Sequence, residues 1–303
     1  MSKPQAPEYI ERLAPYVPGK PIEETQREYG LKRVIKLASN ENPLGPSPKA
    51  IRLLKSYEEV LNLYPDATSF HLKNALAKHL GVASNEIVLG NGSNEIIDLV
   101  IRSFSIPGDQ MVTSQKAFIA YKICAQVHGI KTLETPLTED YRFDLKAIAQ
   151  MVRKNKRVKF VFLANPNNPT GTYNTTSEIK ALVEELKTIR GGSVMLVLDY
   201  AYWEYVTATD LPDALDVRKW YPNTIMLRTF SKIYGIAGLR VGYGVGSKDT
   251  IATLCRGWMY STRPGISIEP ANVRRTSPGA TGTVLRSTTT RPRSASISRP
   301  VPW

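Results

Sequence analysis

The sequence of 303 residues lacks three features that would each define a class of protein. No apolar run approaches the roughly 18 residues that a membrane-spanning helix needs. The opening MSKPQAPEYIERLAPYVPGK has no apolar stretch of the kind found in a secretory signal. Only Cys124 and Cys255 are present, which excludes a disulfide framework. These absences predict a protein of the reducing cytoplasm that does not enter a membrane.

Lysine and acidic residues are scarce near the C-terminal end. No lysine follows Lys248, and from Arg256 onward there are eight arginines but only one acid, Glu269. Residues 261–303 are rich in Arg, Ser, Thr and Pro and show little apolar periodicity. Such a segment cannot bury enough apolar surface to offset the entropy of the chain. We therefore expect a disordered tail over residues 261–303.

The rest of the chain divides into an arm and a larger domain. Proline punctuates residues 1–46, which predicts an extended N-terminal arm. Over residues 47–260, short β-rich runs alternate with helical ones, from EIVLG before SNEIIDLVIRSF to VGYGVG before SKDTIATLCRG. VMLVL is a continuous apolar run, as expected for a strand that is buried on both faces. This alternation predicts an α/β domain with a mostly parallel sheet flanked by helices.

A lysine follows one of the predicted strands, in the segment Arg-Thr-Phe-Ser-Lys of residues 228–232. A glycine-rich segment comes next and ends near Arg240. In open α/β sheets, ligands bind outside the carboxyl ends of the strands. Thr, Ser and Arg side chains there can donate hydrogen bonds to a phosphate. Taken alone, however, Lys232 is better explained as a solvated loop residue, because most lysines lie at the surface.

Three further predicted strands end in polar segments. Asn-Pro-Asn-Asn-Pro-Thr-Gly of residues 165–171 follows KFVFLA, and Asp199 ends VMLVLD. Residues 90–95, Gly-Asn-Gly-Ser-Asn-Glu, join a strand to a helix whose first N–H groups can bind a phosphate. Turn formation or helix capping explains each segment singly. Four such segments at strand ends indicate one common ligand site.

With these motifs the sequence resembles fold-type-I pyridoxal-phosphate-dependent enzymes of the aminotransferase class. It is most similar to histidinol-phosphate aminotransferases. The resemblance covers about residues 9–259 and implies the large transferase fold. The family continues with a smaller C-terminal domain, and we expect this domain to be missing here or replaced by the disordered tail. The segments that carry the resemblance are APYVPGKPIEE, LASNENPLGPSP, LYPD, GNGSNEII, NPNNPTG, DYAY and RTFSKIYGIAGLRVGYG.

The resemblance implies how pyridoxal 5'-phosphate would be held by its ring. Lys232 would bind it covalently and, once freed, would move the proton at the substrate's Cα. Asp199 would keep the pyridine nitrogen protonated, so that the ring can act as an electron sink. Asn168 and Tyr202 would hydrogen-bond to the phenolic oxygen. Phe118 would stack on the ring, although Lys-Ala precedes it where the family usually has Pro-Thr.

The resemblance also implies a phosphate cup, a dimer and a substrate subsite. Tyr64 would reach the phosphate from the second subunit of a homodimer. Tyr16 and Asn42 match positions that the family uses near its substrate, although an arm packed on the domain explains them nearly as well. The residues implied for the cup itself are Ser93, Asn94, Thr229, Ser231 and Arg240.

The implied reaction is transamination between histidinol phosphate and 2-oxoglutarate, in histidine biosynthesis. An aromatic aminotransferase and a threonine-phosphate decarboxylase would share Lys232, Asp199 and Arg240, so these residues do not choose among the three. The segments YVPGKP and NEN favour histidinol phosphate. The three histidines lack metal-ligand spacing, so we expect no metal site.

Two further hypotheses concern the tail. Its arginines could bind a nucleic acid, but they are spread thinly with little aromatic interleaving, so we expect no nucleic-acid partner. Its composition is also what an out-of-frame reading of GC-rich DNA would give. We interpret the segment as a frame-shifted ending that replaces the C-terminal domain. On this interpretation the cofactor binds weakly and turnover is very low.

Overall fold

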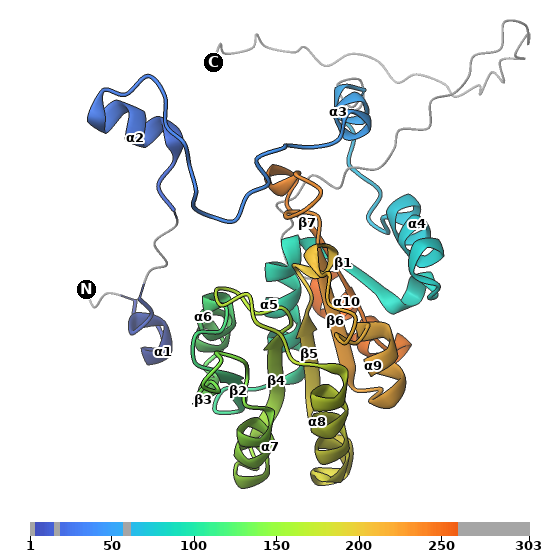
Figure 1. Ribbon diagram of the computed structural model, residues 1–303. Coiled ribbons are helices and arrows are strands. Elements are labelled where there is room, and N and C mark those ends of the chain that lie inside the picture. The colour runs from blue at the N-terminus through green and yellow to red at the C-terminus, as the bar shows by residue number, and fades with distance from the viewer. Residues whose placement is uncertain (1–3, 15–18, 57–61, 260–303) are drawn as a thin grey trace, which may run out of the picture. The chain divides into compact units, whose positions relative to one another are not determined.

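A seven-stranded sheet forms the centre of the computed structural model, which describes residues 4–14, 19–56 and 62–259 (Figure 1). The strand order is β1-β7-β6-β5-β4-β2-β3. The strands are β1 (Ile87–Asn91), β2 (Gln110–Ser114), β3 (Lys131–Thr135), β4 (Val158–Ala164), β5 (Met195–Asp199), β6 (Thr224–Thr229) and β7 (Val241–Val245).

The direction of the strands gathers the predicted motifs at one edge of the sheet. All neighbouring pairs are parallel except those of β7, which runs antiparallel to both β1 and β6. Asn91 at the end of β1 is paired with Val241 at the start of β7, and Thr229 at the end of β6 is paired with Gly242. The beginning of β7 therefore lies beside the carboxyl ends of β1 and β6.

Helices cover the sheet in two groups. One group, in which α5 contacts both α6 and α10, consists of α5 (Gly92–Phe104), α6 (Ile119–Val127) and α10 (Lys248–Met259). In the other group α8 contacts both α7 and α9, and its members are α7 (Leu145–Lys154), α8 (Thr176–Thr188) and α9 (Ala214–Trp220). Every residue of β5 and β6 is buried. The predicted α/β fold with a mostly parallel sheet is confirmed.

Local sequence explains where several helices begin. Asp144 accepts a hydrogen bond from the Ala147 amide at 2.9 Å and so caps α7. At α8 a capping box forms, because Glu178 Oε2 accepts from the Thr175 amide at 2.7 Å while Thr175 Oγ1 accepts from the Glu178 amide. These caps satisfy N–H groups that the first turn of a helix leaves without intrahelical partners.

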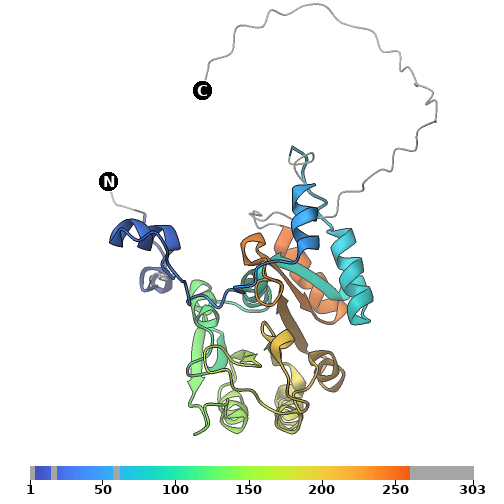
Figure 2. The same cartoon turned by 45° about the horizontal axis from the view of Figure 1, so that its top comes forward.

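The N-terminal region differs from the extended arm that the prolines predicted. It contains α1 (Glu8–Glu11) and α2 (Ile22–Tyr29), and α3 (Pro48–Lys55) and α4 (Phe70–Leu80) follow. Pro21 precedes α2 and Gly30 ends it with a left-handed φ of 64°, so proline and glycine bound the helix here. After α2, a segment of turns and irregular chain passes the sheet edge before reaching α3 (Figure 2). Short 3₁₀ turns are η2 (Ser84–Glu86), η3 (Arg190–Gly192), η4 (Trp203–Tyr205) and η5 (Ala237–Leu239).

No helix among the described residues is long and apolar enough to cross a membrane. The tail of residues 261–303, with the hypotheses that depend on it, lies outside the described residues. The division into an arm, a large domain and a tail stays a prediction.

Candidate active site

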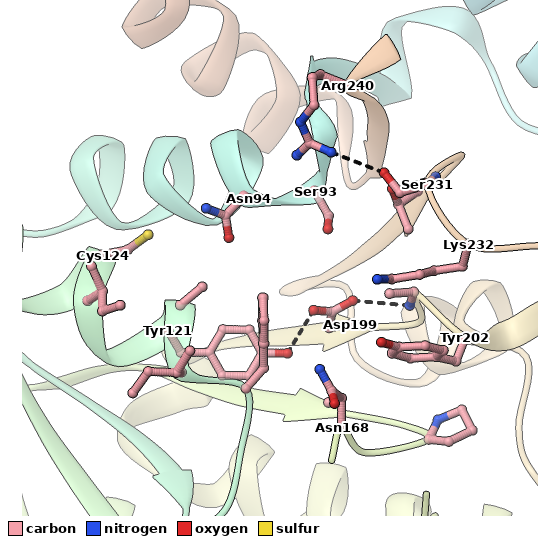
Figure 3. A pocket seen from close by; sticks show the side chains of 18 residues that line it. Ser93, Asn94, Tyr121, Cys124, Asn168, Asp199, Tyr202, Ser231, Lys232 and Arg240 are labelled. Carbon is pink, nitrogen blue, oxygen red and sulfur yellow. Dashed lines mark hydrogen bonds between the residues drawn. The ribbon is translucent and has the colours of Figure 1, made fainter. Parts of the chain in front are cut away.

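A cavity of about 340 Å³ opens at the edge where the strand ends meet (Figure 3). Ten of the residues predicted for one site line this cavity. They come from six separate segments of the chain, which the fold brings together. These residues are Ser93, Asn94, Phe118, Asn168, Asp199, Tyr202, Thr229, Ser231, Lys232 and Arg240.

Of the three other predicted site residues, Tyr64 and Asn42 are not among the described residues that line the cavity. Tyr64 is fully exposed. Asn42 donates to the Ile233 carbonyl at 2.7 Å and accepts from the Leu44 amide at 3.0 Å, so it fastens the arm to the loop that carries Lys232. Tyr16 lies outside the described residues. The roles expected for these three side chains stay predictions.

Asp199 forms the floor of the cavity. It ends the buried strand β5 and is itself only 4% exposed. Its Oδ2 accepts a hydrogen bond from Tyr121 Oη at 2.7 Å, and its Oδ1 accepts from the Ala201 amide at 3.1 Å. Burial raises the pKa of Asp199, whereas the Tyr121 and Ala201 hydrogen bonds and the charge of Lys232 oppose that rise. The carboxylate is thus a buried acid held by two donors.

Tyr121 is a site residue that the sequence analysis missed. It lies on α6, three residues after Phe118, and its side chain is fully buried against the sheet. In Figure 3 its hydroxyl points to Asp199 across the floor of the cavity. The sequence signal that could have indicated Tyr121 is its position one helical turn after Phe118, the residue predicted to stack on the cofactor ring.

Arg240 closes the other side of the cavity. It has a left-handed φ of 54°, and its carbonyl accepts from the Gly92 amide at 2.9 Å. Its Nη1 donates to Ser231 Oγ at 3.3 Å. A Cβ on Gly92 would lie 2.5 Å from Arg240 Nη2. Glycine at this position therefore lets the guanidinium approach the first turn of α5.

The first turn of α5 and the end of β6 complete a cup of hydrogen-bond donors. Ser93 and Asn94 stand at the N-terminal end of α5, a helix of 13 residues. The amides at such an end point outward without intrahelical partners and favour an anion. Thr229 Oγ1 accepts from the Ser231 amide at 3.1 Å, which fixes the turn that presents Ser231. Together with Arg240 these groups can bind a phosphate.

Lys232 and Tyr202 lie beneath the arm. Lys232 Nζ is 3.4 Å from the Ser39 carbonyl and 5.4 Å from the centre of the Tyr202 ring. Tyr202 Oη accepts a hydrogen bond from Asn40 Nδ2 at 2.8 Å. Burial raises the pKa of Tyr202, and the Asn40 hydrogen bond partly offsets it. The arm thus contacts the two side chains that would meet the reacting end of a ligand.

A second polar cluster supports these loops from behind. Arg228 is 7% exposed, and its Nη2 lies 3.4 Å from Glu204 Oε1. The guanidinium carbon lies 5.4 Å from the centre of the Trp203 ring. Tyr234 Oη donates to the same Glu204 oxygen at 3.4 Å. This cluster ties β6, η4 and the loop after Lys232 together.

The fold and the site together define a class of protein. Its members have an α/β domain in which a lysine, a buried aspartate and a cup of hydrogen-bond donors surround one cavity at the sheet edge. The family described as aminotransferase class I and II matches residues 32–273. The chain belongs to this family.

Several relatives are similar over most of this chain. A histidinol-phosphate aminotransferase of Anaeromyxobacter sp. is 46% identical over 248 residues, which are 82% of this chain and 66% of that protein. One from Moorella thermoacetica is 46% identical over 84% of this chain and 64% of its own length. The chain thus spans just under two thirds of the length of these curated relatives.

Among solved structures, a histidinol-phosphate aminotransferase from Sinorhizobium meliloti in complex with pyridoxal-5'-phosphate is similar, with a TM-score of 0.73 and 28% identity. The similarity covers 84% of this chain and 66% of that one.

Proposed function

We propose that the chain is a pyridoxal-phosphate-dependent aminotransferase that acts on histidinol phosphate with 2-oxoglutarate. The observation that carries the proposal is the meeting of Lys232, Asp199 and Arg240 around one cavity. The 46% identity to proteins named histidinol-phosphate aminotransferase supports the substrate. The proposal extends the names of these relatives to a chain that spans about two thirds of their length.

The residues of the cavity fit pyridoxal phosphate at each of its polar ends. The donor set of Ser231, Arg240 and the first turn of α5 suits a phosphate dianion. Asp199, at the floor, is an acceptor suited to a protonated pyridine nitrogen. The glycine at position 92 leaves the space in which Arg240 approaches the helix end. When bound, this cofactor supplies an electron sink for breaking the bond between the substrate's Cα and its hydrogen.

The chain's own residues then have separate roles. Lys232 would hold the cofactor through its Nζ and, when released, would carry the proton at the substrate's Cα. Asp199 would keep the ring nitrogen protonated. Tyr202 and Asn168 would hydrogen-bond to the phenolic oxygen, and Phe118 would cover one face of the ring. The half-buried position of Lys232, under the Ser39 carbonyl, limits its contact with water.

A homodimer is part of the same proposal. Tyr64 is fully exposed, and apolar side chains near it in the sequence, such as Leu63 and Phe70, are more than half exposed. Leu37 and Leu44 of the arm are each 91% exposed. A second copy of the chain would bury this apolar surface and bring its Tyr64 to the phosphate cup. Sedimentation of the protein at several concentrations tests this assembly.

The substrate is tested by a panel in single turnovers. Histidinol phosphate, threonine phosphate and phenylalanine are mixed in turn with the cofactor-loaded protein, and the cofactor absorbance is followed. Histidinol phosphate is expected to react fastest. A clear preference for a substrate without a phosphate would contradict the proposed substrate class but would leave the cofactor assignment intact.

The cofactor assignment is tested by chemical fixation. Pyridoxal phosphate is added, borohydride is used to reduce the adduct, and the modified peptide is located by mass spectrometry. The adduct is expected on Lys232 and should be lost in Lys232→Ala. Lys116→Ala is the matched control, because Lys116 is an exposed lysine at the same sheet edge and does not line the cavity. A Lys232→Ala protein that forms as much adduct as the wild type would overturn the assignment.

A further inference from the structure

On the basis of the proposed function, we propose that Tyr121 is a positioning residue for Asp199. Its hydroxyl holds one carboxylate oxygen, so that Asp199 stays a charged, fixed acceptor at the floor of the cavity. Tyr121 acts through Asp199 and not by contacting the substrate. The proposal adds a residue of α6 to a site whose other assigned residues lie at strand ends, in the loops that follow them and in the first turn of α5.

The geometry gives each carboxylate oxygen one donor of its own. Tyr121 Oη lies 2.7 Å from Oδ2, and the Ala201 amide lies 3.1 Å from Oδ1 (Figure 3). Hydrogen bonds to an ionised acceptor are stronger than those between neutral groups. A carboxylate oxygen can accept more than one hydrogen bond. The two protein donors therefore fix the plane of the carboxylate and still leave acceptor capacity toward the cavity.

Tyr121 is itself held in place, which a positioning role requires. Its side chain is fully buried. The ring is perpendicular to that of Phe118, with centroids 5.7 Å apart, and tilted against that of Phe162 at 5.1 Å. Such aromatic contacts fix the ring orientation. The helix α6 therefore sets the hydroxyl direction, and the same helix begins directly after Phe118.

The charge environment shows why Asp199 needs this donor. Burial alone raises the pKa of Asp199, which favours the neutral acid. Tyr121 from α6, the Ala201 amide after β5 and the Lys232 charge after β6 each act in the opposite direction. Burial and the nearby carboxylate raise the pKa of Tyr121 well above 10, so the phenol remains a donor. A neutral Asp199 would lose its ionic pairing with a protonated ring nitrogen.

The experiment measures Asp199 directly in the full chain, before any cofactor is added. The protein is labelled with ¹³C at the aspartate carboxyls and titrated by NMR, and the Asp199 signal is assigned by its loss in Asp199→Asn. In Tyr121→Phe the titration midpoint should rise by about one pH unit or more, because a donor to an ionised group is lost. Tyr200→Phe is the matched control. Tyr200 is equally buried and adjacent to Asp199, but its hydroxyl donates to the Pro212 carbonyl at 2.7 Å. An unchanged midpoint in Tyr121→Phe, or an equal rise in the control, overturns the inference.

A second variant keeps the test decisive if Tyr121→Phe does not fold. Incorporation of 3-fluorotyrosine at position 121 retains the ring and hydroxyl but makes the phenol a stronger donor, so the Asp199 midpoint should fall. A midpoint that stays constant or rises overturns the inference. In the loaded protein, Tyr121→Phe should bind pyridoxal phosphate roughly tenfold more weakly than Tyr200→Phe. If the wild type does not bind pyridoxal phosphate at all, the proposed function fails while the titration result still stands.

Discussion

The floor of the cavity and the arm above it are held in different ways. The floor consists of Asp199 and its hydrogen-bond donor Tyr121, and the part of the N-terminal arm above it is residues 31–46. Both floor residues are more than nine-tenths buried; Asp199 ends β5, and Tyr121 packs against the sheet. The arm consists mostly of exposed residues and reaches the cavity through a few hydrogen bonds, from Asn40, Asn42 and the Ser39 carbonyl.

The contrast distinguishes the floor, which a single chain buries, from the arm, whose apolar side chains are left for another surface to cover. Continuous apolar strands fix the floor, because each side chain there is surrounded by core. The arm instead exposes Ile35, Leu37 and Leu44 to solvent, at 71%, 91% and 91%. Exposed apolar side chains gathered along one segment are typical of an interaction surface. We therefore expect changes in the floor to have larger effects than changes in the arm.

The largest effect is expected at the floor, for Asp199→Ala. This change removes the only carboxylate among the described residues that line the cavity. We expect turnover to fall by roughly two to three orders of magnitude, as is typical when a preorganised electrostatic partner is lost. Steady-state assays with saturating cofactor measure it. Residual activity within a few-fold of wild type would show that Asp199 does not polarise the cofactor ring.

The next effect is expected where β7 meets the phosphate cup, for Gly242→Ala. A Cβ on Gly242 would lie 2.4 Å from both the Gly92 carbonyl carbon and the Ser93 amide nitrogen. Backbone atoms cannot yield as a flexible side chain does, so the first turn of α5 has to shift. We expect a loss of about 1–3 kcal/mol in the free energy of unfolding, with weaker cofactor binding.

Gly238→Ala is the control for this substitution. No described atom lies within 4 Å of the position that its Cβ would occupy, although Gly238 is also close to Arg240 in sequence. Denaturant unfolding and cofactor titration are measured for both variants. Equal stability and affinity in the two variants would mean that the cup tolerates movement of α5.

A smaller effect, with a defined pH dependence, is expected for Asp199→Asn without cofactor. Folding raises the pKa of this carboxyl above its ordinary 3.8 through burial. The folded state then binds a proton more readily than the unfolded state, so wild-type stability falls as pH rises from about 4 to the raised pKa. The Asn variant should be the more stable at about pH 7, and the difference should shrink toward pH 4. Urea unfolding at several pH values tests this, and a pH-independent difference would contradict it.

The fold was predictable because its signals are local and repeated. The apolar run at β5 and the alternation of strands with helices were sufficient to predict the parallel sheet. The helix Ile22–Tyr29 was not predicted, because the prolines around it suggested extended chain. Proline restricts its own conformation and that of its predecessor, but it is well suited to the position just before or at the start of a helix.

The site was predictable where residues follow strands and unpredictable where contacts cross the fold. Lys232, Asp199 and Asn168 each lie at or just after a strand end, so the sheet alone brings them together. The bond from Tyr121 to Asp199 joins positions 78 residues apart, and the bond from Asn40 to Tyr202 joins positions 162 residues apart. No spacing rule in the sequence specifies such pairs, which depend on how α6 and the arm pack.

The smallest effect is expected in the arm, for Asn40→Ala. The change removes one hydrogen bond to Tyr202 Oη, at a site where Asn40 itself is exposed to water. A neutral, solvent-accessible hydrogen bond contributes about 0.5–1.5 kcal/mol at most, and water can replace the lost donor. Because that bond lowers the pKa of Tyr202 against the effect of burial, its loss should raise the phenol pKa slightly. We therefore expect an unchanged free energy of unfolding and less than tenfold weaker cofactor binding. Both quantities are measured beside Glu41→Ala, because the Glu41 side chain pairs with Lys36 at 2.8 Å and not with Tyr202. If Asn40→Ala instead reduced cofactor affinity as much as Asp199→Ala, the arm would be as essential to the site as the floor, and the contrast between them would not hold.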